Sequence, residues 1–196
     1  VGVTAGTLAA LRQNTRLDYA SMAAAMLGIS VPNFVLGPTL VLLFALTWYW
    51  LPPARWEGPF STHMILPVLT LSAVYMAYIA RLTRSGMLEV LRSNYIRTAR
   101  AKGLSERDVI VRHAVRGGLL PVVSYSGPAL AFLISGTVVV ERIFALPGLG
   151  NYFINANLNR DEPLIIGIVA FMSVTILVFN LLVDVAYAFF DPRIRY

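Results

Sequence analysis

Four long runs of the sequence contain no charged residue, and they limit what the chain can fold into. The runs are Tyr19–Leu51, Met64–Ala80, Gly117–Val140 and Leu164–Val183. An α-helix needs about 20 apolar residues to cross a hydrocarbon core of about 30 Å. Because lipid offers no hydrogen bonds to the backbone, only helices and closed barrels cross it. The runs therefore predict an all-α integral membrane protein.

The composition supports this fold class. The chain has 196 residues, of which 57% are hydrophobic and 13% are charged, whereas a soluble domain carries about 25% charged residues. A net charge of +6 would suit nucleic acid, but the arginines cluster between the apolar runs. Membrane topology explains them better, and we expect no nucleic-acid partner. The absence of cysteine excludes disulfides and thiolate metal sites.

The first uncharged run is too long for a single span. As one helix it would extend over about 50 Å at 1.5 Å per residue, and Pro32 disfavours helix in the residue before it. We therefore expect a partly embedded helix over Tyr19–Ile29 and a span over Asn33–Leu51. With the other three runs this predicts four full spans in a single transmembrane domain, residues 1–196. Val1–Leu11 resembles the end of a preceding span whose beginning the sequence lacks.

The distribution of positive charge predicts the orientation. Three of the 16 lysines and arginines lie in predicted outer loops, namely Arg55, Arg142 and Arg160. The other thirteen flank the apolar runs on the opposite side, nine of them between Arg81 and Arg116. Since cytoplasmic loops carry the excess of positive charge, we expect the central basic segment and the C-terminus to be cytoplasmic.

The central basic segment predicts two short helices joined by a sharp turn. The apolar side of the first helix is marked by residues at helical spacing: Met87, Leu88, Leu91, Tyr95 and Ala99. Gly103 tolerates the positive φ that ends many helices, and Ser105 with Asp108 suits the start of the next. Such an elbow suits docking into a groove of another protein. A solvated connection between two spans is the simpler interpretation.

The elbow carries a recognisable motif. Residues 97–103 read Arg-Thr-Ala-Arg-Ala-Lys-Gly, which resembles the cytoplasmic loop of ABC-importer permeases, whose pattern is Glu-Ala-Ala, three residues, then Gly. Ala99 and Gly103 match that pattern, whereas Arg97 and Thr98 replace its glutamate and first alanine. The later Leu-Pro pair of the pattern is also absent at its usual spacing, where Val115 and Arg116 stand.

These departures are typical of the oligopeptide/dipeptide permease subgroup, to which further blocks of the chain are similar. The blocks are Leu11–Thr15, Arg112–Ala114, Leu119–Pro121, Glu141–Gly150, Leu158–Asp161 and Asp191–Tyr196. Together they cover nearly the whole chain. The resemblance identifies the chain as the C-terminal part of a six-span permease subunit of this family, with a pattern nearer to its oligopeptide members.

The resemblance also implies partners, cofactors and a site. A bacterial inner-membrane importer of this kind contains two homologous permease chains, two ABC ATPases and an extracytoplasmic substrate-binding protein, and its substrate is a peptide. ATP and Mg would bind the ATPases, and this chain would hold no cofactor. Within a coupling loop over residues 85–116, the residues expected to contact an ATPase are Arg97, Thr98, Ala99, Arg100, Lys102, Gly103, Leu104, Ser105, Glu106 and Arg107.

Polar residues within the apolar runs form a second set of candidates, because hydrocarbon makes such groups costly. They are Tyr75, Tyr78, Ser124, Tyr125, Asn180 and Asp184. Each can line a transport path or bond between helices. For Asn180 and Asp184, four residues apart on one helix face, a structural anchor is favoured, with Asp184 paired to an arginine at the cytoplasmic boundary.

The segment from Glu141 to Pro163 predicts a mixed outer loop. It contains Leu146, Pro147, Gly148 and Gly150, a run that must leave regular helix. The run is either an ordinary turn or, by the family resemblance, a segment that dips toward the outer mouth of the pathway, where a binding protein delivers substrate.

Catalysis by this chain is not expected. It has no Gly-x-x-x-x-Gly-Lys-[Ser/Thr] and no His-Glu-x-x-His motif, and His63 and His113 fall on predicted opposite sides of the membrane, so neither a metal site nor a catalytic residue is proposed. Ser135 and Gly136 suit small-residue helix packing better than a nucleophile. The remaining alternatives are a permease for nickel or another small solute, and an ion-driven carrier, which would purify without an ATPase.

Overall fold

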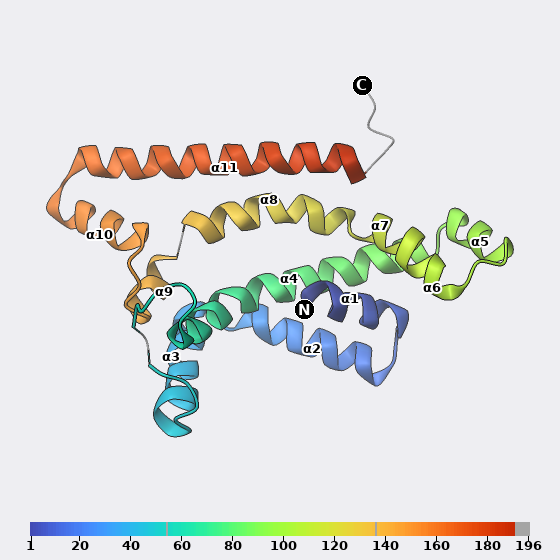
Figure 1. Cartoon of the computed structure of the whole chain (residues 1–196), viewed down its shortest axis with the longest axis horizontal. Helices are drawn as coiled ribbons and strands as arrows, with labels where there is room; N and C mark the ends of the chain where they lie inside the picture. Colours follow the sequence, from blue (N-terminus) through green and yellow to red (C-terminus); the bar gives the residue numbers. More distant parts are fainter. Residues whose placement is uncertain (54, 136, 191–196) are drawn as a thin grey trace. The chain divides into compact units, whose positions relative to one another are not determined.

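The computed structural model describes residues 1–53, 55–135 and 137–190, and all regular structure in these ranges is helical (Figure 1). The helices are α1 (Gly2–Leu11), α2 (Arg16–Ser30), α3 (Asn33–Leu40), the π-helix η1 (Val41–Thr47), the short η2 (Thr62–Met64), α4 (Ile65–Leu91), α5 (Asn94–Ala101), α6 (Glu106–Asp108), the π-helix η3 (Val109–Ala114), α7 (Val115–Gly118), α8 (Leu120–Ser135), α9 (Val138–Ile143), α10 (Leu149–Asn159) and α11 (Glu162–Phe190). The all-α prediction is confirmed.

Helix length and composition identify the membrane spans. Two helical segments in the described part of the chain are long and apolar enough to cross a membrane, Thr62–Leu91 and Glu162–Val185. A third candidate is the pair formed by Arg16–Ser30 and Asn33–Thr47, which is bent by 104° at the break expected around Pro32. By this measure the described part of the chain has two spans, or three if the bent pair is one span, and Gly2–Leu11 and Leu120–Leu133 are shorter apolar helices. The expectation of four full spans stays a prediction.

Three helix ends differ from the sequence-based expectation. The helix expected to stop at Ala80 continues to Leu91, since arginine is a good helix former and Arg81 and Arg84 do not break it. The span expected to reach Leu51 stops at Thr47, just before Tyr49 adopts a positive φ of 54°. The span expected to reach Val140 is interrupted, because α8 ends at Ser135 and α9 begins only at Val138.

The predicted loop between Glu141 and Pro163 is also wrong, because most of it is helical. Its first residues complete α9, and its middle forms α10, which ends at Asn159. Ala145, with φ of 48°, forms part of the turn between these helices. Arg160 ends α10 in the left-handed conformation with φ of 55°. A positive φ at a non-glycine residue marks a tight chain reversal.

The described chain divides into two compact units. Unit 1 contains 1–29, 75–127 and the end of the chain from 180, and unit 2 contains 30–74 and 128–179. The core of unit 2 contains the buried side chains of Leu66, Val140 and Phe144. The assignment of residues 1–196 to one transmembrane domain stays a prediction.

Glycines bring helices of unit 1 into backbone contact. A Cβ atom at Gly6 of α1 would lie 2.4 Å from the carbonyl oxygen of Ala80 in α4. A Cβ at Gly86 of α4 would lie 2.3 Å from the carbonyl oxygen of Gly118 in α7. Small residues allow membrane helices to pack this closely. The packing holds α1 against α4 near Ala80 and α7 against α4 near Gly86, in the segment expected to form the coupling loop.

Candidate functional site

The elbow has the turn that the sequence predicts. α5 ends at Ala101, and Gly103 adopts φ of 77°. Ser105 caps the next helix, because its Oγ accepts a hydrogen bond of 3.2 Å from the backbone N–H of Asp108. From Glu106 the chain is helical through α6, η3 and α7 to Gly118. The helix–turn–helix prediction is therefore confirmed.

The first helix of the elbow is divided, contrary to the prediction of one continuous helix. α4 ends at Leu91, and Ser93, with φ of −71° and ψ of 156°, is the extended residue before α5. This break changes the phase of the helix, so Ile96 is fully buried and Tyr95 is 44% exposed. The placement of Tyr95 on the buried face was wrong, whereas Met87 and Ala99 are buried as expected.

The base of the elbow is packed against the helices of unit 1. Its apolar cluster contains the buried side chains of Ala10, Met87, Ile96, Ala99, Val109 and Ala114. Ala10 belongs to α1 and Met87 to α4, whereas the others lie in α5 and η3. Because buried apolar contacts resist separation, α5 and η3 are held to the end of α4.

The tip of the elbow is exposed, from Ala101 to Arg107, and Figure 1 shows α5 and α6 at the end of α4. Leu104 is 41% exposed, although exposure of an apolar side chain to water is unfavourable. A Cβ atom at Gly103 would have no other atom within 4 Å. Lys102 and Arg107 are likewise exposed. The tip thus presents two cations around an apolar side chain.

Two expected contact residues, Arg100 and Glu106, are already paired with each other within the elbow. Arg100 donates hydrogen bonds from Nε to Oε1 of Glu106 at 2.7 Å and from Nη2 to Oε2 at 3.3 Å. This pair joins α5 to α6 across the turn. Both side chains are largely exposed, so the pair contributes little stability by itself. It orients the two arms of the elbow.

A buried ion pair in unit 1 joins α2 to α4. Arg84 donates from Nε to Oδ1 of Asp18 at 2.6 Å and from Nη2 to Oδ2 at 2.7 Å. The backbone N–H of Asn14 donates to the same carboxylate at 2.9 Å. Asp18 is 1% exposed. Two parallel charge-assisted bonds fix both distance and orientation, so the turn between α1 and α2 is held to α4.

This pair was not predicted from the sequence, although two features of the sequence indicate it. Arg84 lies within a strongly apolar helix, where a cation is costly without a partner, and Asp18 directly precedes an uncharged run. The pairing of Asp184 with an arginine was expected instead. Asp184 is exposed and forms no ion pair with the described residues.

The polar candidates in the apolar helices all lie in unit 1, and two of the aromatic ones are close together. The rings of Tyr78 in α4 and Tyr125 in α8 lie 5.6 Å apart, and Tyr75 is half-buried. Ser124 donates a hydrogen bond to the carbonyl of Leu120, one turn before it.

Asn180 forms part of a helix contact. A Cβ atom at Gly127 of α8 would lie 3.3 Å from its Oδ1 and 2.9 Å from Cγ2 of Val183. Asn180 therefore packs where α11 meets α8. In the described part of the chain, no three His, Asp or Glu side chains lie close enough to hold a metal ion.

The run Leu146–Gly150, which was expected in an outer loop, lies beside a buried carboxylate in unit 2. Glu141 is 7% exposed, and its Oε2 accepts a hydrogen bond of 3.1 Å from the backbone N–H of Asn151, in the first turn of α10. A carboxylate at a helix N-terminus is stabilised by the helix dipole. A Cβ atom at Gly148 would lie 2.1 Å from the carboxyl carbon of Glu141. The glycine thus leaves room for the carboxylate.

The expected departure from helix is confirmed for part of this run. Leu146 and Pro147 lie between the helices and Gly148 is the N-cap of α10, whereas Gly150 lies within its first turn. Gly150 also needs its small size, because a Cβ there would lie 2.8 Å from the Cα of Val138.

Gly148→Ala should therefore displace Glu141 and lower the stability of the protein by about 1.5–3 kcal/mol, the range for losing a hydrogen bond to a charged group. The loss would be measured by thermal unfolding of the purified complex. Gly167→Ala is the control, because a Cβ at Gly167 of α11 meets nothing within 4 Å. Unchanged stability of the Gly148 variant would show that the carboxylate does not need this space.

Comparison with known proteins agrees with the helical membrane architecture. The family described as "Binding-protein-dependent transport system inner membrane component" matches residues 2–196. The chain is 50% identical over 196 residues to the oligopeptide transport system permease protein OppB of Haemophilus influenzae and 52% identical to that of Salmonella typhimurium. It is 48% identical over 194 residues to the dipeptide transport system permease protein DppB of Bacillus subtilis.

These alignments cover 100%, 100% and 99% of this chain, respectively. The chain spans 64% of the length of the two OppB proteins and 62% of DppB. The relatives are named as transport permeases rather than enzymes. The resemblance inferred from the motifs is confirmed, and the chain belongs to the family of inner membrane components of binding-protein-dependent transport systems.

Proposed function

We propose that the chain is part of the permease subunit of an ATP-driven peptide importer. The identity of about half its residues to oligopeptide and dipeptide permeases supports a peptide substrate. In this proposal the chain forms the translocation pathway with a second, homologous permease chain. Two ABC ATPases bind ATP and Mg, and an extracytoplasmic binding protein delivers the peptide.

The exposed elbow with a packed base carries this proposal. A ligand or partner shifts a conformational equilibrium only through contacts that differ between the two states. The tip offers Lys102 and Arg107 to acidic groups or carbonyls of an ATPase, and Leu104 to an apolar pocket. The buried cluster at the base joins the tip to α4. Movement of the ATPases would thus reach the membrane helices through α4.

The outer segment supplies the complementary surface. We propose that the turn from Leu146 to Gly148, held by Glu141 at the N-terminus of α10, lies on the external side and receives the binding protein. Tyr75 and Tyr125 would face the pathway, where aromatic side chains suit peptides of varied sequence. The elbow and the C-terminus would be cytoplasmic, as the distribution of arginines predicts.

Cysteine labelling in cells tests both the orientation and the partner. Residues 1–196 contain no cysteine, so a single cysteine introduced among them is the only one in this segment. Lys102→Cys keeps the Ser105 cap intact and should be labelled only after the cytoplasm is made accessible. It should also cross-link to an ATPase subunit. Asn157→Cys, at an exposed position of α10, should be labelled from outside.

The control is Lys102→Cys expressed without the ATPase genes, which should be labelled but give no cross-link. Labelling of Lys102→Cys from outside would reverse the proposed orientation. A complex that purifies without any ATPase would contradict the importer and favour an ion-driven carrier.

A further inference from the structure

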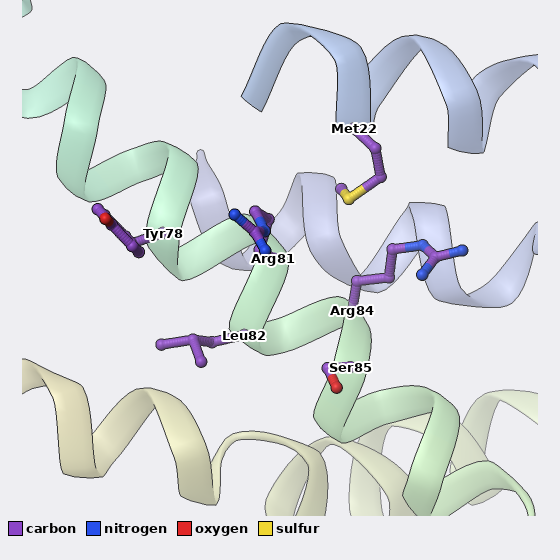
Figure 2. Close-up of a pocket in the computed structure, with 6 residues that line it drawn as sticks. All are labelled: Met22, Tyr78, Arg81, Leu82, Arg84 and Ser85. Carbon is purple, nitrogen blue, oxygen red and sulfur yellow. The ribbon is translucent and has the colours of Figure 1, made fainter. Parts of the chain in front are cut away.

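We propose that a cavity next to the Asp18–Arg84 pair binds the headgroup of an anionic phospholipid such as phosphatidylglycerol. The cavity has a volume of about 420 Å³. Figure 2 shows Met22 of α2 directed toward the part of α4 that carries the two arginines. The lining residues are Met22, Tyr78, Arg81, Leu82, Arg84 and Ser85.

The charge of the cavity calls for an anion. Arg84 is already neutralised, because both oxygens of Asp18 accept its hydrogen bonds. Arg81 is exposed and forms no ion pair with an acidic side chain of the described residues. Two arginines and one aspartate leave a single positive charge, carried by a guanidinium whose five donors can bind two phosphate oxygens at once.

The position of Arg81 along α4 places this charge at headgroup depth. The uncharged part of α4 from Ile65 to Ala80 rises about 24 Å at 1.5 Å per residue. This is most of a hydrocarbon core of about 30 Å. Arg81 therefore lies close to one boundary of the core, where lipid phosphates are found. Basic pockets between membrane helices at such boundaries bind acidic headgroups.

The lining favours a lipid over a soluble anion. Tyr78, Arg81, Leu82 and Ser85 follow the spacing of one helix face, so the donors of Arg81 and Ser85 lie beside the apolar Leu82. Met22 supplies a second apolar wall from α2. A phosphate joined to acyl chains matches this mixture, whereas inorganic phosphate would use only the polar part. The inference depends on membrane location and not on the proposed peptide transport.

Native mass spectrometry of the intact importer, taken from nanodiscs of phosphatidylglycerol or of phosphatidylcholine, tests the assignment. The wild-type complex should retain phosphatidylglycerol about tenfold more strongly than phosphatidylcholine, which corresponds to one good charge-assisted contact. Arg81→Gln should remove this preference, and Arg81→Lys should keep part of it. Arg16→Gln makes the same charge change at an exposed residue outside the cavity and should leave the preference unchanged.

Three results would overturn the proposal. The first is an Arg81→Gln complex that prefers phosphatidylglycerol as the wild type does. The second is displacement of the lipid by inorganic phosphate alone, which would show that the apolar walls contribute nothing. The third is displacement by a short peptide with a free carboxylate, which would assign the cavity to substrate. An importer that retains the lipid through Arg81 but carries no peptide would reject the proposed function and keep this inference.

Discussion

Arg84→Ala is expected to destabilise the protein by about 3–5 kcal/mol, the cost of leaving one member of a buried ion pair without its partner. The remaining carboxylate of Asp18 is 1% exposed and would keep only the hydrogen bond from the backbone of Asn14. Asp18→Ala should cost less, because the side chain of Arg84 is 26% exposed and can reach water. Denaturant titration of the purified protein would measure both losses.

The double variant Asp18→Leu with Arg84→Met separates charge from packing. Replacing both members of a buried pair by apolar residues of similar size is often close to neutral. We therefore expect the double variant to be more stable than Arg84→Ala alone. If the losses of stability of Asp18→Leu alone and Arg84→Met alone added up in the double variant, the two side chains would act independently and the pair would not join α2 to α4.

Gly103→Val is expected to reduce peptide uptake at least tenfold while the protein still inserts and the ATPases still hydrolyse ATP. Gly103 has φ of 77°, and a left-handed conformation costs an ordinary residue about 1–2 kcal/mol, with a β-branched residue at the unfavourable end. The elbow should relieve this strain by changing its angle, because nothing packs around Gly103. Uptake and hydrolysis would be measured in proteoliposomes.

Two matched variants make this result specific. Gly103→Asn should transport almost normally, since asparagine tolerates the left-handed region. Gly58→Val introduces the same kind of strain at φ of 102° in an open loop of unit 2, and it should leave the ratio of uptake to hydrolysis unchanged. Normal uptake by the Gly103→Val complex at normal expression would contradict a docking role for the elbow.

The features predicted correctly from sequence are those determined by local chemistry. The uncharged runs indicated helices in a membrane, Pro32 indicated a break, and Gly103 with Ser105 indicated the turn and cap of the elbow. Each depends on one residue type and its neighbours along the chain. A helix cap needs only a side-chain oxygen within a few residues of the free N–H groups.

The features missed depend on contacts between distant segments. The pair of Asp18 with Arg84 joins residues 66 positions apart, and no periodic pattern contains it. Similarly, the loop expected after Glu141 became helical in α10, whose N-terminus the Glu141 carboxylate contacts.

The contact of Gly86 with Gly118 has a mechanical consequence. Where side chains separate two helices, torsions about χ1 and χ2 can absorb a displacement of several tenths of an ångström before the neighbouring backbone moves. At this contact a Cβ atom would lie 2.3 Å from the opposite carbonyl oxygen, so main chain meets main chain. Because no flexible side chain separates the two backbones, a small displacement of α7 would be transmitted directly to α4.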